Sequence, residues 1–430
     1  MERIIKLSVL LLALLIPVTV IAEDVYDFDV DGVYYKILEN GNDVSVTCKS
    51  CTYTSNTTYY ESDYTGDIII PATVTFNGKT FQVTEIGDHA FYQRGSVTSV
   101  TIPSSITAIG WDAFGYCTGL TRVNIADIAA WCSMTCGSNP LYYARHLYLN
   151  DAEVTDLVIP EGVTAIRNGA FSFCTGLTSV NIGNSVSTIG DNAFEDCTSL
   201  KKVSIGNSVT AIGAVAFEGC TGLMSVTLGN AVKTIGLCAF ENCLGLTSID
   251  IPNSVIEIGG SAFKRCTSLA RATIGNSVAR IGGGAFDGCT ALTSIDIPNS
   301  VVEIGMKAFD GCSGLTSVSI GNSVTAIGRD AFMNAPAIET VTCKALTPPA
   351  WDDLTMFMTN VYNHAPLHVP SGTERAYMAS SGWGQFLTII GDADQDTPSV
   401  DPDYLKCDVN GDGEVNIADV NKVIDAILSH

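Results

Sequence analysis

The sequence predicts an α/β solenoid dominated by β-structure, in which 23-residue repeats stack as a parallel sheet. The stretch from Leu177 to Ser199, LTSVNIGNSVSTIGDNAFEDCTS, recurs almost unchanged along most of the 430 residues. Each copy carries an Ala-Phe pair, and successive pairs lie 23 residues apart except for one interval of 57, with phenylalanines at Phe91, Phe114, Phe171, Phe194, Phe217, Phe240, Phe263, Phe286, Phe309 and Phe332. Such a fixed period indicates stacked coils, because one coil cannot bury its own apolar face.

Each repeat predicts two extended segments followed by a turn. Val180 and Ile182 alternate with Ser179 and Asn181, which is the pattern of a half-buried strand. The later apolar positions step by three and four, and the run is too short for a free helix, so we expect a second extended segment and one helical turn. Parallel strands lie about 4.8 Å apart, so eleven of them would form a curved ribbon on the order of 50 Å long.

The interval of 57 residues predicts one enlarged coil. It resolves as a period of 23 and one of 34, so the second coil lacks its Ala-Phe pair and gains an insertion within residues 124–158. This segment contains Trp131, Cys132 and Cys136 and a predicted hairpin with the sequence LYLNDAEV. Insertions in solenoids often bind ligands. A packing irregularity shared by related chains is the alternative interpretation.

The motif L-x-x-V-x-I followed by G-N-S-V-x-x-I-G-x-x-A-F-x-x-C resembles the leucine-rich repeats of BspA-like bacterial surface proteins. The resemblance extends over roughly residues 24 to 391 and includes the opening DFDVDGVYYKI from Asp27 to Ile37. It implies an α/β leucine-rich repeat solenoid that is secreted or displayed on the surface of a bacterium. It also implies a non-enzymatic binding or adhesion role, with an extracellular protein or cell-surface macromolecule as the partner.

The chain divides into six predicted segments. A secretory signal peptide covers residues 1–22, with Arg3 and Lys6 before an apolar run and cleavage after Ala22; an uncleaved membrane anchor is the alternative. No later stretch is long and apolar enough to span a bilayer. The remaining segments are a β cap (23–84), the solenoid (85–343), a C-terminal cap (344–391), an acidic linker (392–406) and a loop followed by a helix (407–430).

The last segment predicts a calcium site. Side-chain oxygen ligands fall at loop positions 1, 3, 5, 9 and 12, which are Asp408, Asn410, Asp412, Asn416 and Asp419. A glycine stands at position 6, and Glu414 at position 7 offers its main-chain carbonyl. The loop resembles the dockerin type, which implies calcium as the cofactor and a cohesin-like module as the partner. The alternative interpretation is an acidic tail without an ion. Val420, Val423 and Ile424 begin an apolar helix face that either docks on the solenoid or meets a partner.

Cysteine and asparagine form two further periodic columns. Eight cysteines stand three residues after an Ala-Phe phenylalanine, at Cys117, Cys174, Cys197, Cys220, Cys243, Cys266, Cys289 and Cys312. Equivalent side chains on stacked coils are about 4.8 Å apart, too far for a disulfide, so we expect buried free thiols. Cys48 and Cys51 are the first candidate pair for a local disulfide, and Cys132 and Cys136 are the next; the sequence leaves the state of both pairs open. Asn184 and its equivalents are expected to bond the next coil.

No residue pattern predicts an active site, so we expect a protein that is not an enzyme. The five histidines are scattered, and the carboxylates of Asp250 and Asp296 lie two coils apart on an open sheet. A net charge of −23 argues against nucleic acid as a partner.

The strand positions facing solvent carry mainly hydroxyl side chains. They form two columns, one running from Ser99 through Arg122, Asp156 and Ser179, and one from Thr101 through Asn124, Val158 and Asn181. Strong anchors are therefore expected in the insertion or caps.

Three functions follow as hypotheses. The first is a binding or adhesion protein that uses the repeat surface for protein or cell recognition. The second is a dockerin-bearing accessory subunit of an extracellular polysaccharide-degrading assembly, recruited through the segment 408–419. The third, a hydrolase, has the least support in the sequence because no paired catalytic side chains are present.

Overall fold

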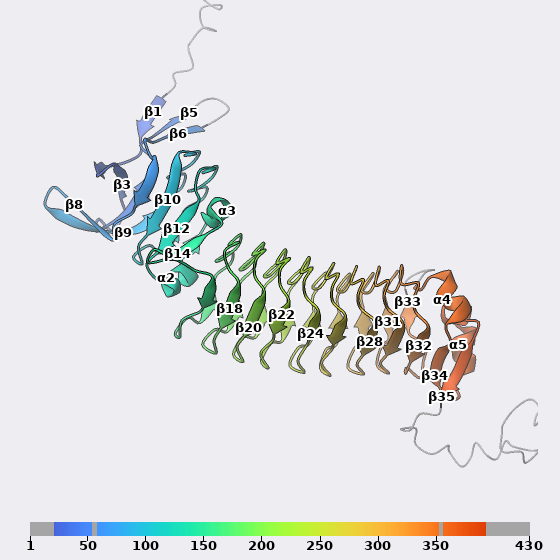
Figure 1. Cartoon of the computed structure of the whole chain (residues 1–430). Coiled ribbons are helices and arrows are strands. Elements are labelled where there is room, and N and C mark those ends of the chain that lie inside the picture. The colour runs from blue at the N-terminus through green and yellow to red at the C-terminus, as the bar shows by residue number, and fades with distance from the viewer. Residues whose placement is uncertain (1–20, 54–57, 352–355, 393–430) are drawn as a thin grey trace, which may run out of the picture.

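The chain forms an elongated solenoid with a β-rich N-terminal cap and a helical C-terminal end (Figure 1). The structure is a computed structural model and describes residues 21–53, 58–351 and 356–392. The predicted signal peptide lies almost entirely outside these residues, and the calcium loop and the linker from residue 393 onward lie wholly outside them. The stacked parallel coils confirm the predicted fold class.

Two small antiparallel arrangements form the N-terminal cap. One sheet has the order β1-β5-β6, with β1 (Ile21–Asp24), β5 (Ser50–Tyr53) and β6 (Thr58–Glu61). The other contains β2 (Phe28–Val30), β3 (Val33–Ile37) and β4 (Asp43–Thr47), joined through β9 (Lys79–Ile86) to β8 (Thr73–Phe76). Because β4 pairs in parallel with β9, the cap continues directly into the first coil.

Each coil contributes one strand to a first ladder of parallel strands. The ladder begins within the predicted cap, because β7 (Gly66–Ile69) already pairs in parallel with β10. Its strands along the chain are β10 (Val97–Ile102), β12 (Arg122–Ile125), β14 (Leu147–Leu149), β16 (Asp156–Val158), β18 (Ser179–Ile182), β20 (Lys202–Ile205), β22 (Ser225–Thr227), β24 (Ser248–Asp250), β26 (Arg271–Thr273), β28 (Ser294–Ile297), β30 (Ser317–Ile320) and β32 (Thr340–Cys343).

The second extended segment of each coil builds a second ladder of two-residue strands. It starts with β9, β11 (Ala108–Ile109) and β13 (Thr135–Cys136), which pair in parallel. A nine-stranded sheet then follows, with β17 (Ala165–Ile166), β19 (Thr188–Ile189), β21 (Ala211–Ile212), β23 (Thr234–Ile235), β25 (Glu257–Ile258), β27 (Arg280–Ile281), β29 (Glu303–Ile304), β31 (Ala326–Ile327) and β33 (Ala350–Trp351).

The third part of each coil, which we call the turn side, is a succession of turns where one helical turn was expected. Its main-chain N–H groups alternate between two kinds of partner. Asn192, Phe194 and Asp196 donate to carbonyls of the next coil at 2.8 to 2.9 Å, whereas Glu195 bonds within its own coil. This alternation requires a left-handed backbone two residues before and two residues after every Ala-Phe phenylalanine, as at Asn192 (φ 57°) and Asp196 (φ 53°).

The core is a continuous stack of phenylalanine rings. From Phe171 to Phe357, neighbouring rings lie 5.1 to 5.4 Å apart between centroids and nearly parallel. The column cysteines beside them are buried and free, which confirms the predicted thiol ladder. The four cysteines of the two candidate local disulfides are also free thiols, so neither disulfide is formed.

The insertion interrupts both ladders. It contains α2 (Ile128–Ser133), α3 (Leu141–Ala144) and the predicted hairpin, formed by β14 and β15 (Ala152–Glu153). Neither β14 nor β15 pairs with β16, so the single ribbon of eleven strands that we expected is divided here, and it is divided again between β22 and β24 and between β26 and β28. The predicted column from Asn124 to Val158 is wrong for the same reason, because Asn124 faces Tyr148 of β14.

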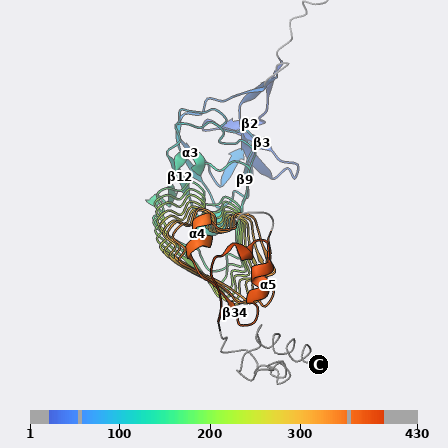
Figure 2. The same cartoon turned by 90° about the vertical axis from the view of Figure 1, so that its right-hand side faces the viewer.

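The C-terminal end covers the last coil. The strands β34 (Leu367–Pro370) and β35 (Ile389–Asp392) extend the first ladder. Figure 2, which looks along the stack, shows α4 (Thr359–His364) and α5 (Glu374–Ala379) over the open end of the coils. A 3₁₀ helix (Trp383–Gln385) follows. Tyr377 and Trp383 are completely buried, as expected for side chains that seal an apolar cross-section.

Candidate interaction surface

The exposed face of the first ladder offers small polar groups that are already paired. In β24 and β26, the carboxylate of Asp250 accepts a hydrogen bond of 2.6 Å from the Thr273 hydroxyl and lies 3.1 Å from the Arg271 guanidinium. Asp296 lies 3.6 Å from the ammonium group of Lys344. Each of the two carboxylates considered as a catalytic pair is therefore engaged separately with its own cation.

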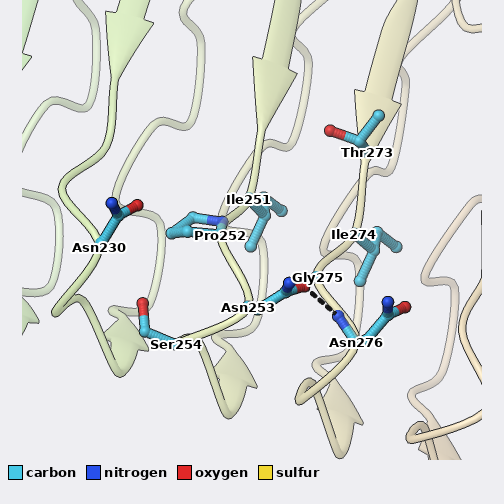
Figure 3. A pocket seen from close by; sticks show the side chains of 9 residues that line it. All are labelled: Asn230, Ile251, Pro252, Asn253, Ser254, Thr273, Ile274, Gly275 and Asn276. Atoms are coloured by element: carbon cyan, nitrogen blue, oxygen red, sulfur yellow. Dashed lines mark hydrogen bonds between the residues drawn. The ribbon is translucent and has the colours of Figure 1, made fainter.

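A shallow hollow of about 530 Å³ lies where the asparagine ladder is interrupted. The Asn184 side-chain carbonyl accepts a 2.7 Å bond from the Asn207 N–H, and the same bond joins Asn253 to Asn276 (Figure 3), so four of the six steps of the predicted ladder are confirmed. Among the described residues, no such bond joins Asn230 to Asn253 or Asn276 to Asn299, where Pro252 and Pro298 replace a glycine. The nine lining residues include no charged side chain and no aromatic ring, so the hollow lacks a strong anchor.

A contiguous group of aromatic side chains covers the turn side of the N-terminal coils. We call it the aromatic edge, and it consists of Tyr60, His89, Tyr92, Tyr116, Tyr142, Tyr143 and Phe173 together with Arg145. Ring centroids of neighbouring members lie 4.0 to 5.7 Å apart, and a hydrogen bond between Tyr116 and Tyr143 joins the two halves. Tyr116 is 59% exposed and Tyr142 49%, so the group is open to a partner.

The insertion builds the C-terminal half of the aromatic edge. Its side chains replace the main-chain acceptors that an ordinary coil would supply: the Tyr143 hydroxyl accepts from the Tyr116 N–H at 3.0 Å, and the Ser138 hydroxyl accepts from the Phe114 N–H at 3.4 Å. The Asn139 amide then donates to the Gly169 carbonyl of the following coil at 2.7 Å. These bonds fix α3, and with it the Tyr142 and Tyr143 rings, between two regular coils.

Three members of the aromatic edge have an unfavourable backbone conformation. Tyr116 (φ 58°), Arg145 (φ 62°) and Phe173 (φ 64°) all lie in the left-handed region. Bulky residues are rare there, and such strain typically costs 1–3 kcal/mol per residue. At the position of Tyr116 and Phe173, six other coils have residues that tolerate this conformation better, and two have Gln93 and Arg265; the six are Asp196, Gly219, Asn242, Gly288, Gly311 and Asn334. Backbone stability therefore does not explain the aromatic side chains.

The two ends of the turn side differ in charge. In the coils after the insertion, the residue that follows each Ala-Phe phenylalanine is mostly acidic, as in Glu195, Glu218, Glu241, Asp287 and Asp310. Burial, followed by repulsion from Glu241 and Glu195, raises the pKa of Glu218. Lys264 lies 3.9 Å from Glu241 and 4.0 Å from Asp287 and partly offsets the repulsion. Acidic groups thus replace the aromatic groups along this side.

A buried arginine lies beside the two cysteines of the insertion. The Arg167 guanidinium stacks on the Trp131 ring at 5.0 Å, and its Nε donates to the Trp131 carbonyl at 3.0 Å, whereas the buried Nη2 has no hydrogen-bond partner. Burial raises the pKa of Cys132 to about 12 against the opposing effect of Arg167. A hollow of about 490 Å³ with a mainly apolar lining separates α2 from the loop before β17. This cluster lies at the junction between the two halves of the solenoid.

The predicted calcium ligands from Asp408 to Asp419 lie outside the described residues, so their geometry stays a prediction. Among the residues that are described, no group of three or more His, Cys, Asp or Glu side chains is arranged to hold a metal ion. No helix in the same residues is long and apolar enough to cross a membrane.

Stacked coils, two parallel ladders and terminal caps define a leucine-rich repeat solenoid protein. Residues 84–136, 144–270 and 233–347 match the family described as "BspA type Leucine rich repeat region". Together these residues make up more than half of the chain. The chain therefore belongs to the BspA-type leucine-rich repeat family. The search among curated proteins finds no match.

Several solved structures are similar to this chain. A leucine rich cell surface protein from Faecalibacterium prausnitzii is 28% identical, with 74% of this chain and 94% of that chain covered and a TM-score of 0.46. A leucine-rich repeat protein from Bacteroides ovatus is 22% identical, with 86% and 100% covered and a TM-score of 0.46. The pneumococcal vaccine antigen PcpA is 17% identical, with 85% and 98% covered and a TM-score of 0.42.

Proposed function

We propose that this protein is a secreted or surface-displayed binding protein that recognises an extracellular protein or a cell surface and performs no catalysis. The contiguous aromatic edge carries this proposal. Tyrosine and arginine are among the residue types that dominate binding energy at protein interfaces, and here the exposed Tyr116 and Tyr142 lie in one group with the half-buried Arg145. Membership of the BspA-type family and the apolar N-terminal run with the features of a signal peptide support the same conclusion.

Binding to a panel of extracellular-matrix proteins and to intact cells tests the proposal. The full chain after removal of residues 1–22 is immobilised, and a capped solenoid of unrelated sequence serves as the reference surface. We expect saturable binding to at least one panel member that the reference does not show. Equal signals on both surfaces across the whole panel contradict the proposal, and release of sugars or peptides from substrates would assign an enzymatic role instead.

A second candidate function rests on the spacing of oxygen ligands from Asp408 to Asp419. A loop of this kind binds calcium through six to eight oxygen atoms, and the following helix then needs a surface for its apolar face. The accompanying proposal is that the C-terminal segment binds calcium and recruits the chain, through a cohesin-like module, to an extracellular polysaccharide-degrading assembly.

Calorimetric titration of calcium distinguishes this candidate. The intact chain should bind one calcium ion, and a chain ending at Asp392 should bind none. Asp408→Ala removes a ligand and should abolish both calcium binding and any calcium-dependent capture of a cohesin module, whereas Asp401→Ala, a carboxylate of the acidic linker, should change neither. Equal titration of the intact and the shortened chain argues against a C-terminal calcium site.

A further inference from the structure

Arg145 presents a cation that has no counterion. Its guanidinium carbon lies 5.0 Å from the centroid of the Phe173 ring and 5.6 Å from that of Tyr142. Among the described residues, none forms a hydrogen bond or an ion pair with this guanidinium. The nearby Arg94 differs, because its three nitrogens donate to the carbonyls of Tyr92, Ser62 and Tyr60. The donors of Arg145 are therefore open to an acceptor from outside.

The surroundings of Arg145 favour a single carboxylate as this acceptor. The guanidinium offers paired N–H donors in a planar fork, which match the two oxygens of a carboxylate, and the rings on which it stacks hold that fork in place. At the other end of the aromatic edge, Asp88 accepts a hydrogen bond from the Trp111 N–H at 2.6 Å. Glu195 and Asp196 follow Phe173 on the next coil, and among the described residues neither forms an ion pair with Arg145. His146, next to Arg145, is already paired with Glu153 at 2.7 Å.

The rest of the aromatic edge fits apolar side chains better than sugar hydroxyls. A glycan needs many hydrogen-bonding side chains, because each buried hydroxyl that loses water must find a partner. Here several polar groups near the rings are engaged internally: the Tyr143 hydroxyl accepts a hydrogen bond from the Tyr116 N–H, and the Asn139 amide donates to the Gly169 carbonyl and the Ser172 hydroxyl. The surface thus offers mainly ring faces, one cation and the hydroxyls of the exposed Tyr116 and Tyr142.

We propose that the aromatic edge binds a protein segment in which an acidic side chain stands beside apolar or aromatic side chains, the carboxylate pairing with Arg145 and the apolar groups packing on Tyr116, Tyr142 and Phe173. This inference rests on the proposed binding function and names its site and the chemistry of its partner.

Selection of a random-peptide phage library on the full chain tests the chemistry of the partner. We expect the enriched peptides to carry Asp or Glu next to aromatic or aliphatic residues. Synthetic copies should bind Arg145→Gln about tenfold more weakly than the wild type, and the loss should shrink at high salt. Arg265→Gln is the matched control, since Arg265 has the same left-handed backbone on the same side of a later coil and lies far from the aromatic rings.

The substitution Tyr116→Asn separates binding from folding. Asparagine occupies the equivalent left-handed position in two other coils, at Asn242 and Asn334, so the variant should unfold at the same temperature as the wild type or at a higher one. Peptide binding should nevertheless fall about tenfold, because the exposed ring is lost. A variant that both binds and unfolds like the wild type overturns the role of Tyr116.

The outcomes distinguish this inference from the function on which it rests. Binding to matrix proteins or cells that survives in both Arg145→Gln and Tyr116→Asn overturns the inference and leaves the proposed function standing. Enriched peptides without acidic residues overturn the assigned partner chemistry. If the wild type binds on a glycan array and Tyr142→Ala does not, the aromatic edge binds carbohydrate instead of a protein segment. Absence of binding to every probe overturns both proposals together.

Discussion

The thiol of Cys197 donates a hydrogen bond of 3.2 Å to the main-chain carbonyl of Phe171, one coil earlier. Six further column cysteines make the same bond to the phenylalanine of the preceding coil, at 2.9 to 3.2 Å. Cys174, which follows the insertion, has no such phenylalanine before it. The column is thus more than a row of small apolar side chains, because each thiol also connects two coils.

The column thiols should be unreactive in the native protein. Burial, the largest effect, raises the pKa of Cys266 and Cys312 to about 12, and it raises the pKa of the half-buried Cys238 to about 12 as well, so access of the reagent rather than acidity distinguishes these thiols. Among the described cysteines, a thiol reagent at pH 8 should therefore label the half-buried Cys238 and Cys136 first, and the column should react only after addition of denaturant. Labelling of a column thiol as quickly as Cys238, located by mass spectrometry, would contradict the buried ladder.

Relief of backbone strain at Val215 should stabilise the solenoid. Val215 has φ 61°, a conformation in which a β-branched side chain is strongly disfavoured, and in two other coils the equivalent residue is a glycine, Gly169 or Gly284. We expect Val215→Gly to raise the free energy of unfolding in urea by about 1 kcal/mol, since part of the relief is offset by the flexibility of glycine.

Ala214→Gly is the control for Val215→Gly. Ala214 is the neighbouring residue and lies outside the left-handed region, so its replacement should lower the free energy of unfolding by about 0.5–1 kcal/mol. Equal losses of stability in both variants would show that the strain assigned to Val215 is absent.

Removal of one ring from the phenylalanine stack should have a large cost. Phe240 is completely buried, with neighbouring rings at 5.2 and 5.4 Å on its two sides. Phe240→Ala should lower the free energy of unfolding by about 3–5 kcal/mol, because the ring is lost and a cavity remains. Phe240→Leu, which keeps most of the volume, should cost clearly less. Comparable losses in both variants would indicate that ring stacking, rather than filled volume, stabilises the core.

The repeat made most of each coil predictable. The insertion could not be predicted in the same way, because it breaks the repeat. Phe194, Cys197 and Asn184 recur at a fixed period, so their neighbours in space are their equivalents in sequence, and the structure confirms the parallel register, the thiol ladder and most of the asparagine ladder. Within residues 124–158 no period remains. The strand containing Tyr148 therefore could not be aligned with β12, and the column from Asn124 to Val158 was wrong.

The aromatic edge was missed although the sequence contains a signal for it. The residue two positions after each Ala-Phe phenylalanine is Gly, Asn or Asp in six copies, which indicates a left-handed turn; Gln93, Tyr116, Phe173 and Arg265 depart from this preference, and Tyr116 and Phe173 are the aromatic ones. Comparison of this single position across the copies would have marked both residues. The expectation that anchors lie in the insertion was general and named neither Tyr142 nor Arg145, because only folding brings α3 beside Phe173.

The acidic column of the turn side should make the protein more stable as the pH falls from neutral. The pKa of Glu218 is raised above its ordinary value of 4.5, first by burial and then by Glu241, Glu195 and Asp196. The folded state therefore holds a proton more tightly than the unfolded state, and stability decreases as the pH rises from about 4.5 through the folded-state pKa. Glu218→Gln removes this group, so the variant should unfold at a higher temperature than the wild type at pH 7 and at the same temperature near pH 4.

Glu257→Gln is the control for this pH dependence. Glu257 lies on the second ladder, is half exposed and pairs with the Arg280 guanidinium at 3.1 Å, so its neutralisation should leave the unfolding temperature at pH 7 unchanged or slightly lower. Unfolding temperatures of the wild type and both variants, measured between pH 4 and pH 8, check the prediction. If Glu218→Gln parallels the wild type over this whole range, repulsion within the acidic column does not oppose folding.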